Sequence, residues 1–351
     1  MSPVLVRKLK LLLLICAFTA GAGVLYQLVD NDELTFDSVV VGVPIGLLVG
    51  VSELFVLDRW GGRLRSMSFG RLIVVKAALY TVGTFVVVNT LSLVLGLRDG
   101  RTMDEFWVAL LDVEQWTLIV VSLALFALVV FFLQVNRVLG QDVLMKFLRG
   151  RYHRPTEEDR VFMFLDLKGS TTIAEGLGAT YYRLLDDFFH DISHPVMMAR
   201  AEIYQYVGDE VVLTWELDRG VRDANCIRVY TLINEAVAAR AEEYRQKYGV
   251  VPEYKAGLHC GRVISAQIGD IKREIVYNGD VVNTTSRIQE KCGELGVDLL
   301  ISGDLMGRLN LPEAYAAEAL GATALKGKEV AVDLFAVRRQ PGERPSAFPI
   351  A

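Results

Sequence analysis

The stretch RVFMFLDLKGST, residues 160–171, decides the fold of the charged half of the chain. Its short apolar run is rich in Phe and ends at Gly169, a pattern typical of a buried strand. Ser170 and Thr171 follow the glycine and favour the start of a helix. The sequence therefore predicts a buried strand whose last residues, Asp166 and Leu167, lead directly into a helix.

Further elements follow this strand in mixed order. We expect helices over 171–200, about 223–248 and 281–295. We expect strands within 201–217, 254–269, 273–280 and 298–303 and near 330–338, the first of these being two strands that meet at the turn Gly208-Asp209. Such an order predicts an α+β domain in which helices cover one sheet.

The first 140 residues are different, because they hold only 22 of the 79 charged residues. Apolar segments lie at about 9–29, 39–57, 72–97 and 116–135, each close to the roughly 20 residues that cross a bilayer. The run VVSLALFALVVFFLQV lacks a polar face, which disfavours a buried bundle of a soluble protein. We therefore expect a four-helix transmembrane domain, residues 1–135, in contact with the lipid bilayer.

Lys and Arg are concentrated near the N-terminus, in the 58–71 loop and after the fourth segment, whereas the 30–38 and 98–115 loops are acidic. The positive-inside rule then places both termini and the charged half in the cytoplasm, in a multi-pass protein of the inner (plasma) membrane. Glu53 and Lys76 fall at similar depth in neighbouring segments. They either pair with each other or reach the interface separately.

Residues 136–155 join the two halves and have a helical pattern with one apolar face. They form either a passive linker or a coupling helix that pairs with a second copy, and the apolar face favours the coupling helix. The following domain then covers residues 156–340, and 341–351 form a flexible tail.

Two acids are candidate metal ligands. Asp166 ends its strand, and Asp209 occupies a tight turn between two apolar strands. Carboxylates at strand ends suit a divalent metal, and the free amides of the helix start at Gly169 suit phosphate oxygens. Taken singly, Asp166 is more often a helix cap and Asp209 more often part of an ordinary turn than a metal ligand.

A third patch lies in NGDVVNTTSRIQ, where Asn283 and Arg287 are four residues apart and share one helix face. Asn can donate to and accept from a ribose, and Arg offers a fork for phosphate oxygens. An exposed helix face would explain the same spacing without a ligand. Lys326 and Lys328 in LKGKEV either add phosphate-binding charge or close a surface turn.

Composition excludes further classes of protein. The net charge of −5 and the pI near 5.6 argue against nucleic-acid binding. The four cysteines form no CxxC pair, so neither a zinc site nor a disulfide framework is expected.

The motifs FLDLKGST, YQYVGDEVVLTW, GLHCGRV, NGDVVNTTSRIQ and LKGKEVAVDLFAV, in this order, resemble the catalytic domain of class III adenylate/guanylate cyclases over roughly 156–338. The resemblance implies a ferredoxin-like palm in which Asp166 and Asp209 hold two Mg²⁺ or Mn²⁺ ions per active site. It implies that Asn283 orients the ribose and Arg287 stabilises the transition state. Lys326 matches the lysine that grips the terminal phosphates. The segment Leu167, Gly169, Ser170 and Thr171 would then meet the nucleotide phosphates.

The resemblance further implies a homodimer in which each site takes its metal acids and its Asn-Arg helix from different protomers. The expected reaction is conversion of ATP to cyclic AMP and pyrophosphate. The purine-selecting positions hold Gln205 and Val276, which fit neither the adenine nor the guanine pattern. A guanylate or dual-specificity cyclase therefore stays open. So do a diguanylate cyclase, a receptor whose domain only senses nucleotide, and a transporter or channel subunit with a nucleotide-sensing domain.

Overall fold

The computed structural model describes residues 3–30, 37–56, 67–98, 100–110, 113–139, 154–270, 274–328 and 330–340. The chain divides near residue 140 into two compact units, each of which is described by itself. Most of the expected coupling segment, 136–155, and the expected tail, 341–351, lie outside the described residues.

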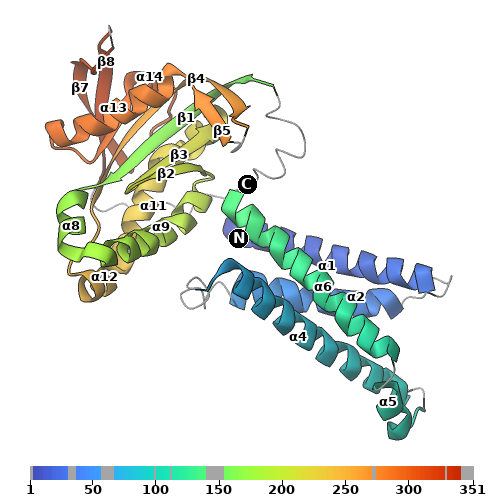
Figure 1. Ribbon diagram of the computed structural model, residues 1–351. Helices are drawn as coiled ribbons and strands as arrows, with labels where there is room; N and C mark the ends of the chain where they lie inside the picture. Colours follow the sequence, from blue (N-terminus) through green and yellow to red (C-terminus); the bar gives the residue numbers. More distant parts are fainter. Residues whose placement is uncertain are drawn as a thin grey trace. The chain divides into compact units, whose positions relative to one another are not determined.

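The first unit is entirely helical in its described part (Figure 1). Each of the four apolar segments forms a helix, and the short helix α5 was not predicted. The helices are α1 (Pro3–Asp30), α2 (Asp37–Val51) with its π-helical continuation η1 (Ser52–Val56), α4 (Phe69–Arg98), α5 (Met103–Leu110) and α6 (Val113–Leu139). Within the described ranges, α4 alone is long and apolar enough to cross a membrane. The four predicted membrane spans are therefore not confirmed.

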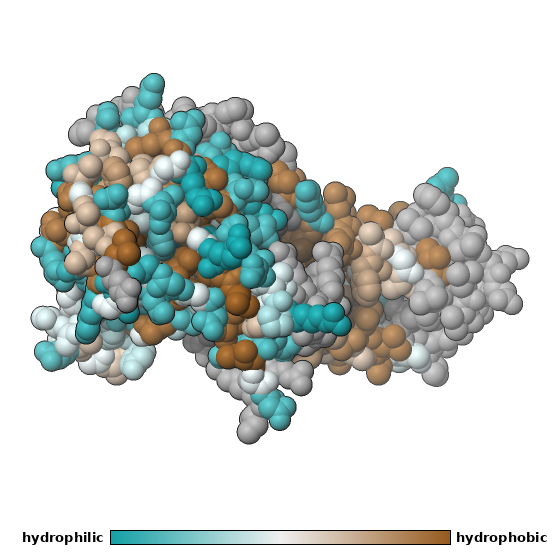
Figure 2. All heavy atoms as spheres, turned by 90° about the horizontal axis from the view of Figure 1, so that it is seen from above, coloured by the Kyte–Doolittle hydropathy of each residue, from teal (hydrophilic) through white to brown (hydrophobic). Residues whose placement is uncertain are grey.

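Buried polar groups lie inside this unit, and apolar side chains lie outside it. Lys76 Nζ donates to both carboxylate oxygens of Glu53, at 2.6 and 2.8 Å, and the Tyr80 hydroxyl donates to the same carboxylate at 2.5 Å. Of the two arrangements that the sequence allows for Glu53 and Lys76, the structure thus contains the pair. Leu13 and Val74, by contrast, are 69% and 67% exposed. Figure 2 shows the hydrophobic colour over the described surface of the helices.

The second unit is built on one mixed sheet, in which β4 and β6 are parallel and the remaining pairs antiparallel. The strand order is β2-β3-β1-β4-β6-β8-β7, and β5 pairs with β4. The strands are β1 (Thr156–Leu167), β2 (Glu202–Val207), β3 (Glu210–Glu216), β4 (Tyr254–Ile268), β5 (Glu274–Asn278), β6 (Leu299–Ser302), β7 (Tyr315–Thr323) and β8 (Val332–Arg339). The α+β prediction is confirmed for this unit.

Alternation along β1 explains how helices cover the sheet (Figure 1). Successive strand residues point to opposite faces. Val161, Met163 and Leu165 join the large core beneath α8 (Ser170–Leu177), α9 (Tyr181–Met198), α11 (Asn225–Ala239) and α12 (Ala241–Tyr248). Phe162 and Phe164 face the other side and pack with Val281 of α13 (Asp280–Leu295). The α13 face of the sheet therefore has its own smaller cores.

Three details differ from the sequence prediction. The helix expected over 171–200 is two helices separated by a 3₁₀ turn at Gly178–Thr180, and the helix expected over 223–248 breaks at Arg240. Strand β7 was missed, because its sequence YAAEALGAT is rich in Ala and Gly, which are rare in strands.

Candidate active site

Asp166 lies near the end of β1, on the face of the sheet that α13 covers. Gln289 of α13 donates from Nε2 to Asp166 Oδ2 at 3.1 Å. Lys255, which opposes Asp166 across β1 and β4, has its Nζ 3.8 Å from the same oxygen. The carboxylate is thus held by a neighbouring helix and a neighbouring strand, and it stays about one quarter exposed.

Asp209 follows Gly208 in the turn between β2 and β3. Gly208 has a φ of +64°, a conformation that favours glycine. Burial, the charge of Asp209 and a hydrogen bond with Asp209 raise the pKa of Asp166 above its usual range. The turn therefore brings the two acids together, as the sequence predicts. In the part of the chain that the structure describes, the buried Oδ2 of Asp209 has no hydrogen-bond partner.

The residues present fit a divalent cation. Two adjacent carboxylates, one with an orphaned buried oxygen, leave negative charge that a hard cation would compensate. Among the described residues no cluster of three or more His, Cys, Asp and Glu side chains has metal-binding geometry. The protein would therefore supply Asp166 and Asp209, with phosphate oxygens and water as the remaining ligands, as is usual for Mg²⁺.

The helix start after β1 is open to an anion. Gly169, with a φ of +64°, stands at the N-cap of α8, and no side chain caps the helix. The idea that Asp166 is a helix cap is therefore wrong. Ser170 and Thr171 begin the first turn, where free amides favour phosphate. The side chain of Leu167 is buried in the core, so only its main chain could meet a ligand.

Helix α13 carries Asn283 and Arg287. It lies so close to β4 that a Cβ on Gly257 would come within 2.4 Å of the backbone nitrogen of Gln289. Asn283 is exposed and Arg287 is half-buried. The guanidinium of Arg287 lies beside Gly327, in the turn that also holds the exposed Lys326. Arg287 therefore lies beside the turn that carries Lys326.

Lys328 of the same turn has a different task. Its ammonium contacts the Asp280 carboxylate at the start of α13, and this hydrogen bond lowers the pKa of Asp280. Lys328 therefore closes a turn, which was one of its two expected roles.

Gln205 and Val276, the two positions expected to select the purine, lie on β2 and β5. Gln205 opposes Val212 and is exposed, whereas Val276 opposes Ala266 and is half-buried. Their chain neighbours Tyr204 and Tyr277 touch, with ring centroids 5.1 Å apart. By strand alternation the Val276 side chain lies on the opposite face of β5 from Tyr277. The structure thus brings the two strands together at these tyrosines.

Sequence reasoning missed three residues around the acids: Gln289, Lys255 and Glu210. Burial, followed by the charges of Asp166 and Asp209, raises the pKa of Glu210 to about 7. The sequence could have identified Glu210, because it is part of the motif Gly208-Asp209-Glu210. Gln289 and Lys255 carry no sequence signal, because their contact with Asp166 depends on helix placement and strand register.

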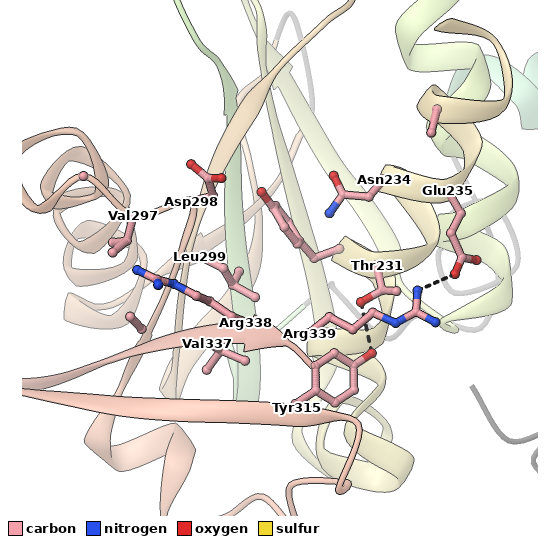
Figure 3. A pocket seen from close by; sticks show the side chains of 14 residues that line it. Thr231, Asn234, Glu235, Val297, Asp298, Leu299, Tyr315, Val337, Arg338 and Arg339 are labelled. Atoms are coloured by element: carbon pink, nitrogen blue, oxygen red, sulfur yellow. Dashed lines mark hydrogen bonds and ion pairs between the residues drawn. The ribbon is translucent and has the colours of Figure 1, made fainter. Parts of the chain in front are cut away.

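A separate cavity of about 550 Å³ lies between α11 and the β6–β8 edge (Figure 3). Arg339 pairs with Glu235 at 2.7 Å, and the hydroxyls of Thr231 and Tyr315 are 3.1 Å apart. The residues that line this cavity include none of the predicted site residues.

Comparison with known proteins places the second unit in a family. The chain is 42% identical over 211 residues to adenylate cyclase 2 of Rhizobium meliloti (strain 1021), covering 60% of this chain and 58% of the relative. It is 25% identical over 183 residues to an adenylate cyclase of Anabaena cylindrica, covering 50% and 36%. The chain thus spans little more than half, or less, of these relatives.

Solved structures agree on the fold. A bacterial light-regulated adenylyl cyclase superposes with a TM-score of 0.55 at 17% identity, covering 65% of this chain and 67% of that one. The profile of the adenylate and guanylate cyclase catalytic domain matches residues 153–337, more than half of the chain. The resemblance seen in the sequence motifs is confirmed, and the chain belongs to the adenylate and guanylate cyclase catalytic domain family.

Proposed function

We propose that the protein is a membrane-anchored adenylate cyclase that converts ATP to cyclic AMP and pyrophosphate in a homodimer. The observation that carries the proposal is the pair Asp166 and Asp209, two adjacent acids with a buried oxygen that has no partner among the described residues. Two like charges held together destabilise a fold unless a cation joins them. Binding of the metal ions needed for phosphoryl chemistry would explain why the two acids lie together.

In the proposed reaction the ribose 3′-oxygen attacks the α-phosphorus of ATP. The bond from the 3′-oxygen to phosphorus forms, the bond from phosphorus to the bridging oxygen breaks, and the hydroxyl proton leaves to solvent. When bound, two Mg²⁺ or Mn²⁺ ions would supply Lewis-acid activation and neutralise phosphate charge. Asp166 and Asp209 would hold these ions, Asn283 would orient the ribose, and Arg287 with Lys326 would stabilise the charge on the leaving pyrophosphate.

The arrangement within one chain supports a shared site. The α13 side chain that contacts Asp166 is Gln289, whereas Arg287 lies with the turn of Lys326. Each chain would therefore present an acidic half and a cationic half, and a second copy would supply the half that is missing. A closed two-fold dimer then contains two complete sites.

We favour ATP over GTP, since a relative at 42% identity is named an adenylate cyclase. Gln205 can donate or accept, so it suits either purine, and the Val276 side chain can do neither. GTP turnover is accordingly an outcome that the first experiment must measure.

Membrane anchoring is supported by the polarity of the first unit. Exposed apolar side chains surround a buried ionic cluster, the reverse of a water-soluble fold. The loop charges then favour a multi-pass arrangement with the cyclase in the cytoplasm, where ATP is available.

The first experiment is product analysis of the purified full-length protein with ATP and with GTP, each with Mg²⁺ or Mn²⁺ and with chelator. We expect cyclic AMP as the main product and none with chelator. Absence of any cyclic nucleotide under all metal conditions would reject the proposed function.

A second experiment tests the shared site. Asp166→Ala and Arg287→Ala are each expected to be inactive. If the two chains mix at random, half of the dimers are mixed and each has one intact site of two, so activity should return to about a quarter of native. No recovery in a sample with verified mixed dimers would mean that each site is built within one chain.

A further inference from the structure

One buried cation joins four strands beside the purine-selecting positions. Arg160 of β1 is only 1% exposed. It donates from Nε to Thr214 Oγ1 on β3, from Nη1 to Glu158 Oε2 on its own strand, and from Nη2 to Glu202 Oε2 on β2, each at 3.0 Å. Its guanidinium carbon also lies 4.6 Å from the ring centroid of Tyr277 on β5.

A buried charge is costly unless it is paired and hydrogen-bonded, and one that meets four strands restricts their relative positions. Arginine suits this task because its planar fork directs several donors at fixed angles, while its face can stack on an aromatic ring. Replacing it with an apolar side chain is therefore expected to loosen the strands.

Tyr277 transmits this restraint to β5. Among the strands that the structure describes, β5 pairs with β4 alone. The Tyr277 ring packs edge-on against Phe162 of β1 and Tyr204 of β2, with centroids 5.6 and 5.1 Å away. Arg160 and this aromatic group connect β5 to the β1–β3 part of the sheet.

The residues next to these contacts are the purine-selecting ones. Tyr204 precedes Gln205, at a point where the β2–β3 register shifts. Tyr277 follows Val276, whose apolar side chain can contact a purine but cannot hydrogen-bond to it. Selection between adenine and guanine would then depend on how far the Gln205 amide lies from Val276.

We propose that Arg160 is a positioning residue for purine selection, which holds β5 against β2 and so fixes the separation between Gln205 and Val276. The inference rests on the proposed function, because it assumes that a purine nucleotide occupies this edge. Arg160 itself does not contact the nucleotide.

The test is Arg160→Met in the full-length protein, which keeps the length of the side chain but removes its fork. We expect KM for ATP to rise about tenfold with kcat changed less than about threefold, and the ratio of kcat/KM for ATP and GTP to fall about tenfold. Glu202→Gln keeps an acceptor for Arg160 but removes one charge, so it should change the same ratio by about threefold. If Arg160→Met does not fold, the milder Glu202→Gln variant tests the proposal in its place.

Arg240→Met is the matched control, since Arg240 also pairs with a buried acid, Asp191, but lies at the break between α11 and α12, on the opposite side of the sheet. It should lower the melting temperature and leave the ATP to GTP ratio unchanged. If the Arg160 and Glu202 variants behave like this control, losing folded protein without a change in the ratio, the positioning role is overturned.

Binding of 3′-deoxy-ATP and 3′-deoxy-GTP, which cannot cyclise, separates this inference from the proposed function. We expect Arg160→Met to reduce the ratio of the dissociation constants for 3′-deoxy-GTP and 3′-deoxy-ATP about tenfold, even in a protein that makes no cyclic nucleotide. An unchanged ratio overturns the inference. A wild-type protein that binds neither analogue overturns the inference together with the proposed function.

Discussion

Two clusters of buried charge, one in each unit, differ in their balance. In the helical unit the Glu53 carboxylate receives Lys76 and the Tyr80 hydroxyl, so opposite charges meet. In the cyclase domain Asp166, Asp209 and Glu210 lie together with Lys255 as the nearby cation, and one oxygen of Asp209 has no partner in the described chain. In the helical cluster each charged group is paired with another group of the chain, whereas the cyclase cluster keeps an excess of negative charge, which we propose that a metal ion neutralises.

The difference indicates what each cluster is for. A balanced buried pair holds helices in one arrangement, because breaking it leaves an uncompensated charge. A group of like charges is retained only where function requires it, since it destabilises the empty fold. The two clusters should therefore respond in opposite ways when a carboxylate is converted to an amide.

The largest effect is expected in the cyclase cluster. Asp209→Asn should lower turnover by at least about 10³-fold, equivalent to about 4 kcal/mol of lost transition-state stabilisation, because the proposed metal ligand is lost. The same change should leave the melting temperature in chelator unchanged or higher, since it removes one of the crowded negative charges. Steady-state kinetics and circular dichroism melting measure the two quantities.

Asp191→Asn is a suitable control for that experiment, because Asp191 is also a buried acid of the cyclase domain but is paired with Arg240 and Tyr244. It should lower the melting temperature and keep turnover per folded molecule. A destabilised Asp209→Asn protein would show instead that Asp209 is structural.

Much of the cyclase cluster could be predicted from the sequence, because local signals mark strand ends and turns. The run ending at Asp166 and the Gly208-Asp209 turn are such signals, and the spacing of Asn283 and Arg287 fixes a common helix face. The contact of Gln289 with Asp166 could not be predicted, since it depends on how closely α13 approaches Gly257.

In the helical unit the sequence indicated the depth of Glu53 and Lys76 but left open whether they pair. Depth follows from position along an apolar helix, whereas pairing depends on how each helix is rotated about its axis. The π-helical turn Ser52–Val56, which contains Glu53, is a rotation that periodicity alone does not reveal.

A smaller effect is expected in the helical cluster. Glu53→Gln leaves Lys76 buried beside a neutral amide, which should lower the free energy of unfolding of the full-length protein in detergent by about 3 kcal/mol. The double variant Glu53→Gln/Lys76→Met removes both charges and should recover most of this loss. Thermal unfolding followed by tryptophan fluorescence measures it.

Ser92→Ala, at an exposed position within α4, provides a control with little expected effect. Equal stability of the single and double variants would contradict the idea that the pair is balanced, because removal of the second charge would then bring no recovery.

The smallest effect concerns pH and the balanced acid of the cyclase domain. Burial opposes ionisation of Asp191, but hydrogen bonds from His190, Tyr244 and Arg240 outweigh it and lower the pKa of Asp191. A carboxyl group with a lowered pKa in the folded state stabilises the fold fully above its unfolded pKa of about 4, and loses that contribution as the pH falls through the folded value. Asp191→Asn should therefore cost about 1 kcal/mol at pH 7 and progressively less below about pH 4. Urea unfolding of wild type and variant between pH 3 and 7 measures this difference. A constant difference across that range would mean that Asp191 stabilises the helices by packing and not by its charge.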